Sequence, residues 1–154
     1  DDFGSQRGLL ISPEKIFKLF GDMKKELFDL AHRYSAKVTH HCCGSSREVI
    51  PTFIELGMDA LQTIQPQAAG MDPFSLKKAF KGRIVFHGGV DVQGWLQRSS
   101  IGEIKHHIHR LMDEVGKDGG YILAPCHCIQ PDTPIDNVIA MYEAVAERRG
   151  KTLG

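Results

Sequence analysis

The sequence lacks an excess of charge of either sign and lacks any long apolar run. Among its 154 residues, 19 Lys and Arg balance 19 Asp and Glu. A basic surplus, the electrostatic footprint of nucleic-acid or membrane-surface binding, is therefore missing. No apolar run approaches the roughly 20 residues of a membrane span, and the first residues do not resemble a signal peptide. We predict a soluble cytoplasmic protein of one domain that binds neither nucleic acid nor membrane.

Cysteine is also scarce, and its placement is informative. All four cysteines lie in two clusters, His40-His41-Cys42-Cys43 and Cys126-His127-Cys128. Paired Cys-x-x-Cys knuckles, the usual mark of structural zinc, do not occur. Neighbouring cysteines are poorly placed to bridge each other. A disulfide between the clusters is an alternative that a chain predicted to be cytoplasmic disfavours.

The order of predicted elements indicates an α/β fold. Short apolar runs bounded by Gly and Pro predict strands at 37–42, 60–64, 83–87 and 121–125. Between them, N-cap residues and apolar periodicity predict helices beginning at Ser12-Pro13, 46, Asp72-Pro73, Ser100 and Thr133-Pro134, with Pro51 as a kink in the second. Strands that alternate with helices form parallel sheets. Four such strands make half of a (β/α)8 TIM barrel.

Both clusters lie at the carboxyl ends of predicted strands, where parallel α/β folds carry their chemistry. Residues two apart on a strand share a face, so the first cluster offers His40 with Cys42, or His41 with Cys43. We select His41 and Cys43, since the more polar set should face the barrel interior. A register slip of one residue would exchange the two pairs.

Cys126, at the end of the last predicted strand, completes a set of three soft ligands with His41 and Cys43. Three protein ligands leave the fourth zinc position open, which is the arrangement of catalytic zinc. The alternative is buried thiols beside ordinary core histidines. His127 is a candidate catalytic residue, and Gln65 and Asp91, at two other strand ends, are candidate substrate contacts, with Gln65 also a weak fourth ligand. We assign His106, His107 and His109 to a solvated helix face.

Ordered sequence blocks carry a resemblance to a known family. They are Asp1-Asp2-Phe3-Gly4-Ser5-Gln6-Arg7-Gly8, Ser12-Pro13-Glu14, His41-Cys42-Cys43-Gly44-Ser45, Gln65-Pro66, Gly70-Met71-Asp72-Pro73, Phe86-His87-Gly88-Gly89-Val90-Asp91 and Ala124-Pro125-Cys126-His127-Cys128-Ile129-Gln130-Pro131-Asp132. Together they resemble the carboxyl-terminal half of the uroporphyrinogen decarboxylase superfamily, and within it the zinc-dependent, corrinoid-linked methyltransferases.

The resemblance implies that residues 1–154 are the carboxyl-terminal half of a (β/α)8 barrel whose amino-terminal half is absent from this chain. It implies Zn²⁺ bound by His41, Cys43 and Cys126. In such enzymes the metal holds a small thiol acceptor as thiolate, which takes a methyl group from the cobalt of a separate corrinoid protein.

Two alternatives remain open. Uroporphyrinogen decarboxylases carry Gly-His-Gly at the last strand, so His127 matches a histidine important for decarboxylation in porphyrin biosynthesis, although the flanking cysteines depart from that pattern. The second alternative is an inactive half-barrel that self-associates as a homodimer and so buries its exposed sheet edges.

Overall fold

The sheet has four parallel strands in the order of the sequence. The computed structural model describes residues 2–150 and contains β1 (Thr39–His41), β2 (Ala60–Ile64), β3 (Val85–Val90) and β4 (Tyr121–Pro125). Each strand pairs in parallel with the next, so β1 and β4 are the two open edges. With helices between the strands, the chain forms half of a TIM barrel, as predicted.

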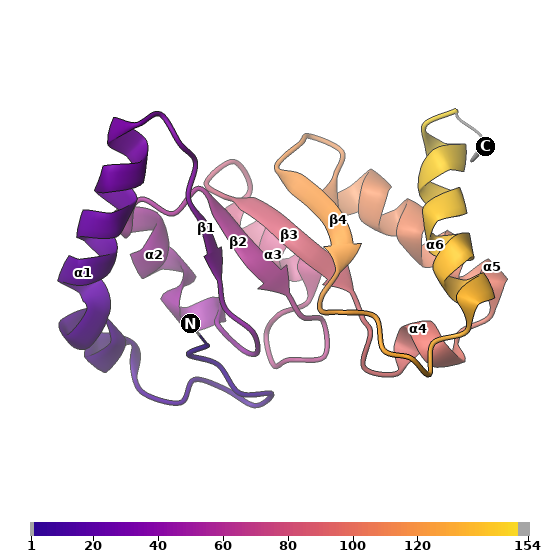
Figure 1. Ribbon diagram of the computed structural model, residues 1–154, viewed down its shortest axis with the longest axis horizontal. Coiled ribbons are helices and arrows are strands. Elements are labelled where there is room, and N and C mark those ends of the chain that lie inside the picture. The colour runs from indigo at the N-terminus through magenta and orange to yellow at the C-terminus, as the bar shows by residue number, and fades with distance from the viewer. Residues whose placement is uncertain (1, 151–154) are drawn as a thin grey trace.

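The helices flank the sheet and cover one of its faces. They are α1 (Pro13–Arg33), α2 (Ile50–Leu56), α3 (Pro73–Phe80), α4 (Trp95–Arg98), α5 (Ile101–Arg110) and α6 (Ile135–Arg148). Short turns, η1 (Arg47–Val49) and η2 (Leu111–Val115), precede α2 and extend α5. In Figure 1, α3 lies behind the sheet, while α1 lies beyond β1 and α6 lies beyond β4. None of the helices in the described range 2–150 is both long enough and apolar enough to cross a membrane.

Local capping explains where several helices begin. The Ser12 hydroxyl accepts a hydrogen bond from the backbone N–H of Lys15, and the Asp72 carboxylate accepts one from Ser75. Ser100 and Glu103 form a capping box at the start of α5. These side chains satisfy backbone donors that the first helical turn leaves unpaired.

One predicted kink and the bounds of two predicted strands were wrong. Pro51 does not kink a helix but lies in the first turn of α2, where its missing N–H is no loss. β3 continues past His87 to Val90 through Gly88 and Gly89, which adopt positive φ angles of 121° and 93°. β1 is shorter than predicted and begins at Thr39.

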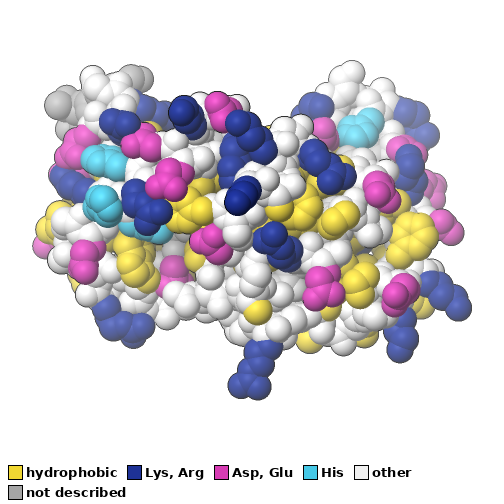
Figure 2. Space-filling view, turned by 180° about the vertical axis from the view of Figure 1, so that it is seen from behind, with side chains coloured by type: hydrophobic (Ala, Val, Ile, Leu, Met, Phe, Trp, Pro, Cys, Tyr) yellow, Lys and Arg dark blue, Asp and Glu magenta, His cyan; other side chains and the backbone are white. Residues whose placement is uncertain are grey.

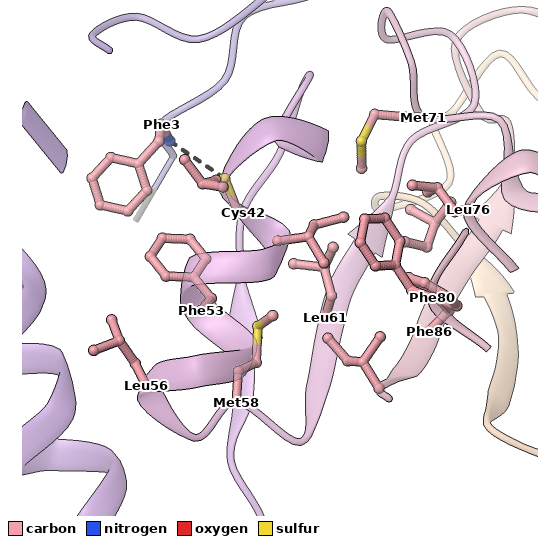
Figure 3. Packing of buried hydrophobic residues seen from close by; sticks show 14 of the residues in the cluster. Phe3, Cys42, Phe53, Leu56, Met58, Leu61, Met71, Leu76, Phe80 and Phe86 are labelled. Carbon is pink, nitrogen blue, oxygen red and sulfur yellow. Dashed lines mark hydrogen bonds between the residues drawn. The ribbon is translucent and has the colours of Figure 1, made fainter. Parts of the chain in front are cut away.

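The core divides into two buried clusters on the helical side of the sheet. The first joins α1, α2 and α3 to β2, β3 and the residues that flank β1, through side chains such as Phe53, Leu61 and Phe86, which Figure 3 labels among the packed residues. The second joins α5 and α6 to β3 and β4. Burying one side chain of this size contributes about 1.5–3 kcal/mol, so the two clusters hold the strand ends in place.

Part of the apolar surface of α1 is exposed rather than buried. Ile16 and Phe28 pack into the core, but Leu19 and Leu27 are 65% and 54% exposed. At the other open end, Ile139 of α6 is also exposed. Helices beyond the edge strands pack on one side only, so both open ends of the sheet present apolar side chains. From behind, by contrast, charges of both signs intermingle, in keeping with the zero net charge (Figure 2).

The prediction of a solvated histidine face on α5 was only partly right. His106 is exposed, but the His107 ring lies 4.7 Å from the Trp95 ring, and burial lowers the pKa of His107. His109 Nε2 lies 3.0 Å from the carbonyl oxygen of Ala144 on α6. α4 and α6 therefore cover a face that the sequence pattern left to solvent.

Candidate metal centre

The alternation along β1 separates the two histidine–cysteine pairs. His40 and Cys42 are buried on the helical side, where the His40 ring packs edge-on against Phe53 at 4.7 Å. Burial, assisted by nearby positive charge, lowers the pKa of His40 to about 3, so its imidazole is neutral. His41 and Cys43 lie on the opposite, open face. The face chosen from the sequence for His41 and Cys43 is the one the structure shows.

His41 and Cys43 meet a third donor, Asp2. One possible ligand atom from each residue lies within 4.8 Å of the others. Cys43 Sγ is 3.3 Å from His41 Nε2, and Asp2 Oδ1 is 3.6 Å from the same nitrogen. Sequence reasoning quoted Asp2 within a motif but gave it no role. The signal that could have identified Asp2 was the adjacent Phe3, a large apolar residue able to anchor the segment in the core.

Neighbouring side chains orient this cluster. His41 Nδ1 lies 2.9 Å from Gln62 Oε1, which directs Nε2 toward Cys43 and Asp2. Gly44 has a φ of +75°, and a Cβ there would lie 2.6 Å from the carbonyl oxygen of Gly4. Only glycine permits this close approach of the amino-terminal segment. Gln65 Oε1 accepts a hydrogen bond of 2.8 Å from the Gly44 N–H, so in this structure Gln65 braces the loop after β1.

The three donors suit a zinc ion. Zinc takes sulfur, imidazole nitrogen and carboxylate oxygen in a tetrahedron, whose bond lengths put neighbouring ligand atoms about 3.3–3.8 Å apart. The two separations from His41 Nε2, 3.3 and 3.6 Å, fall in that range. Burial raises the pKa of the Cys43 thiol, and the Asp2 carboxylate raises it further. A cation would favour the thiolate and offset both effects.

Cys126 lies at the same end of the sheet but outside the close cluster. It follows β4 directly, is almost fully buried, and donates its backbone N–H to Val90 at 2.9 Å. Burial raises the pKa of the Cys126 thiol, and Cys126 is among the groups whose charge raises the pKa of Cys43. The Cys126 side chain packs in the second buried cluster, beside β3 and the helices α4, α5 and α6. The role of Cys126 as third ligand stays a prediction.

The remaining candidates occupy the loops after β3 and β4. His127 is exposed and lines a pocket of about 410 Å³ with Arg98 and Gln93. Asp91 is buried, and its carboxylate accepts hydrogen bonds from Gln67 Nε2 and from the backbone N–H groups of Gln93 and Trp95. Asp91 therefore braces the loop after β3. The catalytic role of His127 and the substrate contacts of Gln65 and Asp91 stay predictions.

Comparison with known structures gives a relative of the same fold. The chain is similar to a methyltransferase from Methanosarcina mazei, with a TM-score of 0.67 and 24% sequence identity. The match covers 91% of this chain and 39% of that chain, so this chain spans well under half of the length of that methyltransferase. No curated protein sequence matches the chain significantly.

A family comparison covers nearly the whole chain. Residues 3–148 match the family model described as uroporphyrinogen decarboxylase. This range contains all four strands and both cysteine clusters. The chain belongs to the uroporphyrinogen decarboxylase family.

Proposed function

We propose that this chain carries the zinc site of a methyltransferase that moves a methyl group between a corrinoid protein and a small thiol. The observation that carries the proposal is the meeting of His41 and Cys43 on the open face of the sheet, their donor atoms 3.3 Å apart. Membership of the uroporphyrinogen decarboxylase family and the likeness to a methyltransferase fold support it.

His41, Cys43 and Cys126 would hold the zinc ion. When bound, zinc lowers the pKa of a coordinated thiol, so that a substrate thiol is deprotonated near neutral pH. With a methyl-corrinoid partner bound, the substrate sulfur would form a C–S bond with the methyl carbon, and the electron pair of the broken cobalt–carbon bond would stay on the corrinoid. The proton lost by the thiol goes to solvent. The chain's own residues would hold His41 through Gln62 and would supply the Cys43 and Cys126 thiols from the ends of β1 and β4.

We also propose that the sheet of this domain acts as the carboxyl-terminal half of a closed eight-stranded barrel. Both edge strands, β1 and β4, are open in the described residues, and apolar side chains of α1 and α6 are exposed beside them. A closed barrel has eight strands and eight outer helices. Here five helices of seven or more residues, α1, α2, α3, α5 and α6, already serve four strands.

The complement that fits therefore has four strands and three helices. A homodimer would bring a second helix to each open end, where α1 or α6 already lies (Figure 1). An amino-terminal half with three helices completes the outer ring of eight without placing two helices at the same open end. A homodimer in solution, detected as twice the chain mass by sedimentation at micromolar concentration, would contradict this part of the proposal.

Decarboxylation of uroporphyrinogen is the second candidate function. Family membership favours it, as does the exposed position of His127 in a polar pocket beside Arg98. Turnover of uroporphyrinogen that a zinc chelator leaves unchanged, and that His127→Ala abolishes, would establish it over methyl transfer.

The decisive experiment uses the four cysteines as matched pairs. Zinc content is measured by atomic emission in the unchelated protein and in Cys43→Ser, Cys126→Ser, Cys42→Ser and Cys128→Ser. The zinc content should fall in Cys43→Ser and Cys126→Ser. It should persist in Cys42→Ser and Cys128→Ser, because Cys42 is in the core and Cys128 is exposed outside the cluster. Demethylation of methylcobalamin by a thiol should follow the zinc content. Full zinc in Cys43→Ser would overturn the proposal.

A further inference from the structure

The amino-terminal segment holds a carboxylate against the metal-binding face. Asp2 lies 39 residues before His41 in the sequence, yet its Oδ1 accepts a hydrogen bond of 2.7 Å from the backbone N–H of Cys43. The same oxygen lies 3.6 Å from His41 Nε2. Nothing in the spacing of the histidines and cysteines points to this residue.

The position of Asp2 is fixed by the residues that follow it. The Phe3 ring is buried between Phe20 and Phe53, with centroid distances of 5.5 and 5.9 Å, and the Phe3 N–H points to Cys42 Sγ. Two residues later, the carbonyl oxygen of Ser5 accepts a hydrogen bond of 2.8 Å from the Ser45 N–H. The segment is thus held on both sides of the loop after β1, and the Asp2 carboxylate is held at the rim of the site.

We propose that Asp2 is an exchangeable oxygen ligand of the zinc site, which the substrate thiol displaces. This inference rests on the proposed function. Asp2, His41 and Cys43 are the donors within 4.8 Å of one another, and Cys126 would supply the fourth position. The Asp2 side chain is 52% exposed, so a small thiol in solution can reach its carboxylate.

The chemistry of the ligands determines which one leaves. Zinc is a borderline-soft ion, and thiolates bind it more strongly than a single carboxylate oxygen does. An incoming thiol therefore exchanges with Asp2 and not with Cys43. His41 is held by Gln62 and stays in place. Asp2 thus occupies a zinc coordination position when no substrate is bound and leaves that position when a thiol binds.

The test is Asp2→Asn in the full chain, with Asp22→Asn, an exposed carboxylate on α1, as the matched control. The asparagine oxygen still accepts the hydrogen bond from Cys43, so the segment keeps its anchor. Zinc affinity, measured by competition with a chromophoric chelator, should fall about tenfold to hundredfold, the range that altering groups around a zinc site costs. Asp22→Asn should bind zinc as the wild type does.

The second readout is thiol binding to the Co²⁺-substituted protein, followed by its sulfur-to-cobalt charge-transfer absorption with 2-mercaptoethanol as the probe. Asp2→Asn should bind the thiol more tightly, because no carboxylate has to be displaced. Unchanged affinities for zinc and thiol in Asp2→Asn, with zinc still lost in Cys43→Ser, would overturn this inference alone. A fall in zinc affinity without tighter thiol binding would overturn the proposal that the thiol displaces Asp2. A wild type without zinc affinity would overturn the proposed function as well.

Discussion

Asp59 offers the clearest quantitative test of how this fold positions its strand ends. Its carboxylate, just before β2, accepts a hydrogen bond of 2.8 Å from Lys37 Nζ and one of 2.9 Å from the Val38 N–H. The same carboxylate lies 2.7 Å from His32 Nε2. Asp59 thereby joins the end of α1 and the segment before β1 to β2. Although burial opposes ionisation, these hydrogen bonds lower the pKa of Asp59 from 3.8 to about 2.

The magnitude follows from linkage between protonation and folding. A fall in pKa from 3.8 to about 2 corresponds to about 2.5 kcal/mol of stability at neutral pH. Because the side chain is 24% exposed, solvent screening reduces this to about 1–2 kcal/mol. The folded-state pKa lies below the unfolded one, so the stabilisation is complete above about pH 4 and is lost as the pH falls toward 2.

The assay is urea unfolding of Asp59→Asn and wild type at pH 7 and at pH 3. The variant should be less stable by about 1–2 kcal/mol at pH 7. The difference should shrink at pH 3, where the Asp59 carboxyl is largely protonated in the unfolded chain but still mostly ionised in the folded one. Asp118→Asn, which removes an exposed ion pair with Lys81, serves as the control and should change stability little. Equal stability of Asp59→Asn and wild type at pH 7, or a difference that does not depend on pH, would refute the reasoning.

Three further predictions concern the site, the sheet and the open end. Gln62→Ala should weaken zinc binding about tenfold or more by releasing the orientation of His41, as a chelator competition would show; unchanged affinity would contradict it. Gly89→Ala should destabilise the fold by about 1–3 kcal/mol in urea, since its φ is +93° and a Cβ would lie 2.6 Å from the Tyr121 hydroxyl; a neutral effect would be incompatible with this backbone. Leu27→Lys should change the stability of the chain by less than about 0.5 kcal/mol, because this leucine is exposed. It should nevertheless block association with the proposed amino-terminal half, expressed separately and followed by sedimentation. A large loss of stability would show that α1 packs differently.

The close agreement of several boundaries has a local cause. β2 and β4 run over the predicted residues, and α3 and α5 begin at their predicted caps, Asp72 and Ser100. Hydrogen bonds within three residues along the chain decide such starts, and those residues are visible in the sequence. The boundaries of β3 were missed because its extension depends on a close approach between Gly88 and Thr63 of the neighbouring strand.

In the candidate site, too, some features follow from the local sequence and others from tertiary contacts. The alternation of side chains along a strand was enough to separate His41 and Cys43 from His40 and Cys42, and strand order alone put both cysteine clusters at one end of the sheet. These properties follow from the two-residue repeat of side chains along a strand and from the order of the strands, and both can be read from the sequence.

Tertiary packing decided the rest. Asp2 joins the cluster because Phe3, next to it, enters a core built from α1 and α2, a contact between segments far apart in the chain. The exposure of Leu27 depends equally on which elements stand beside α1. Strand period and helix caps are set by near neighbours and can be predicted from sequence. Distances between side chains brought from different elements depend on how the whole core packs, so only the folded structure determined them.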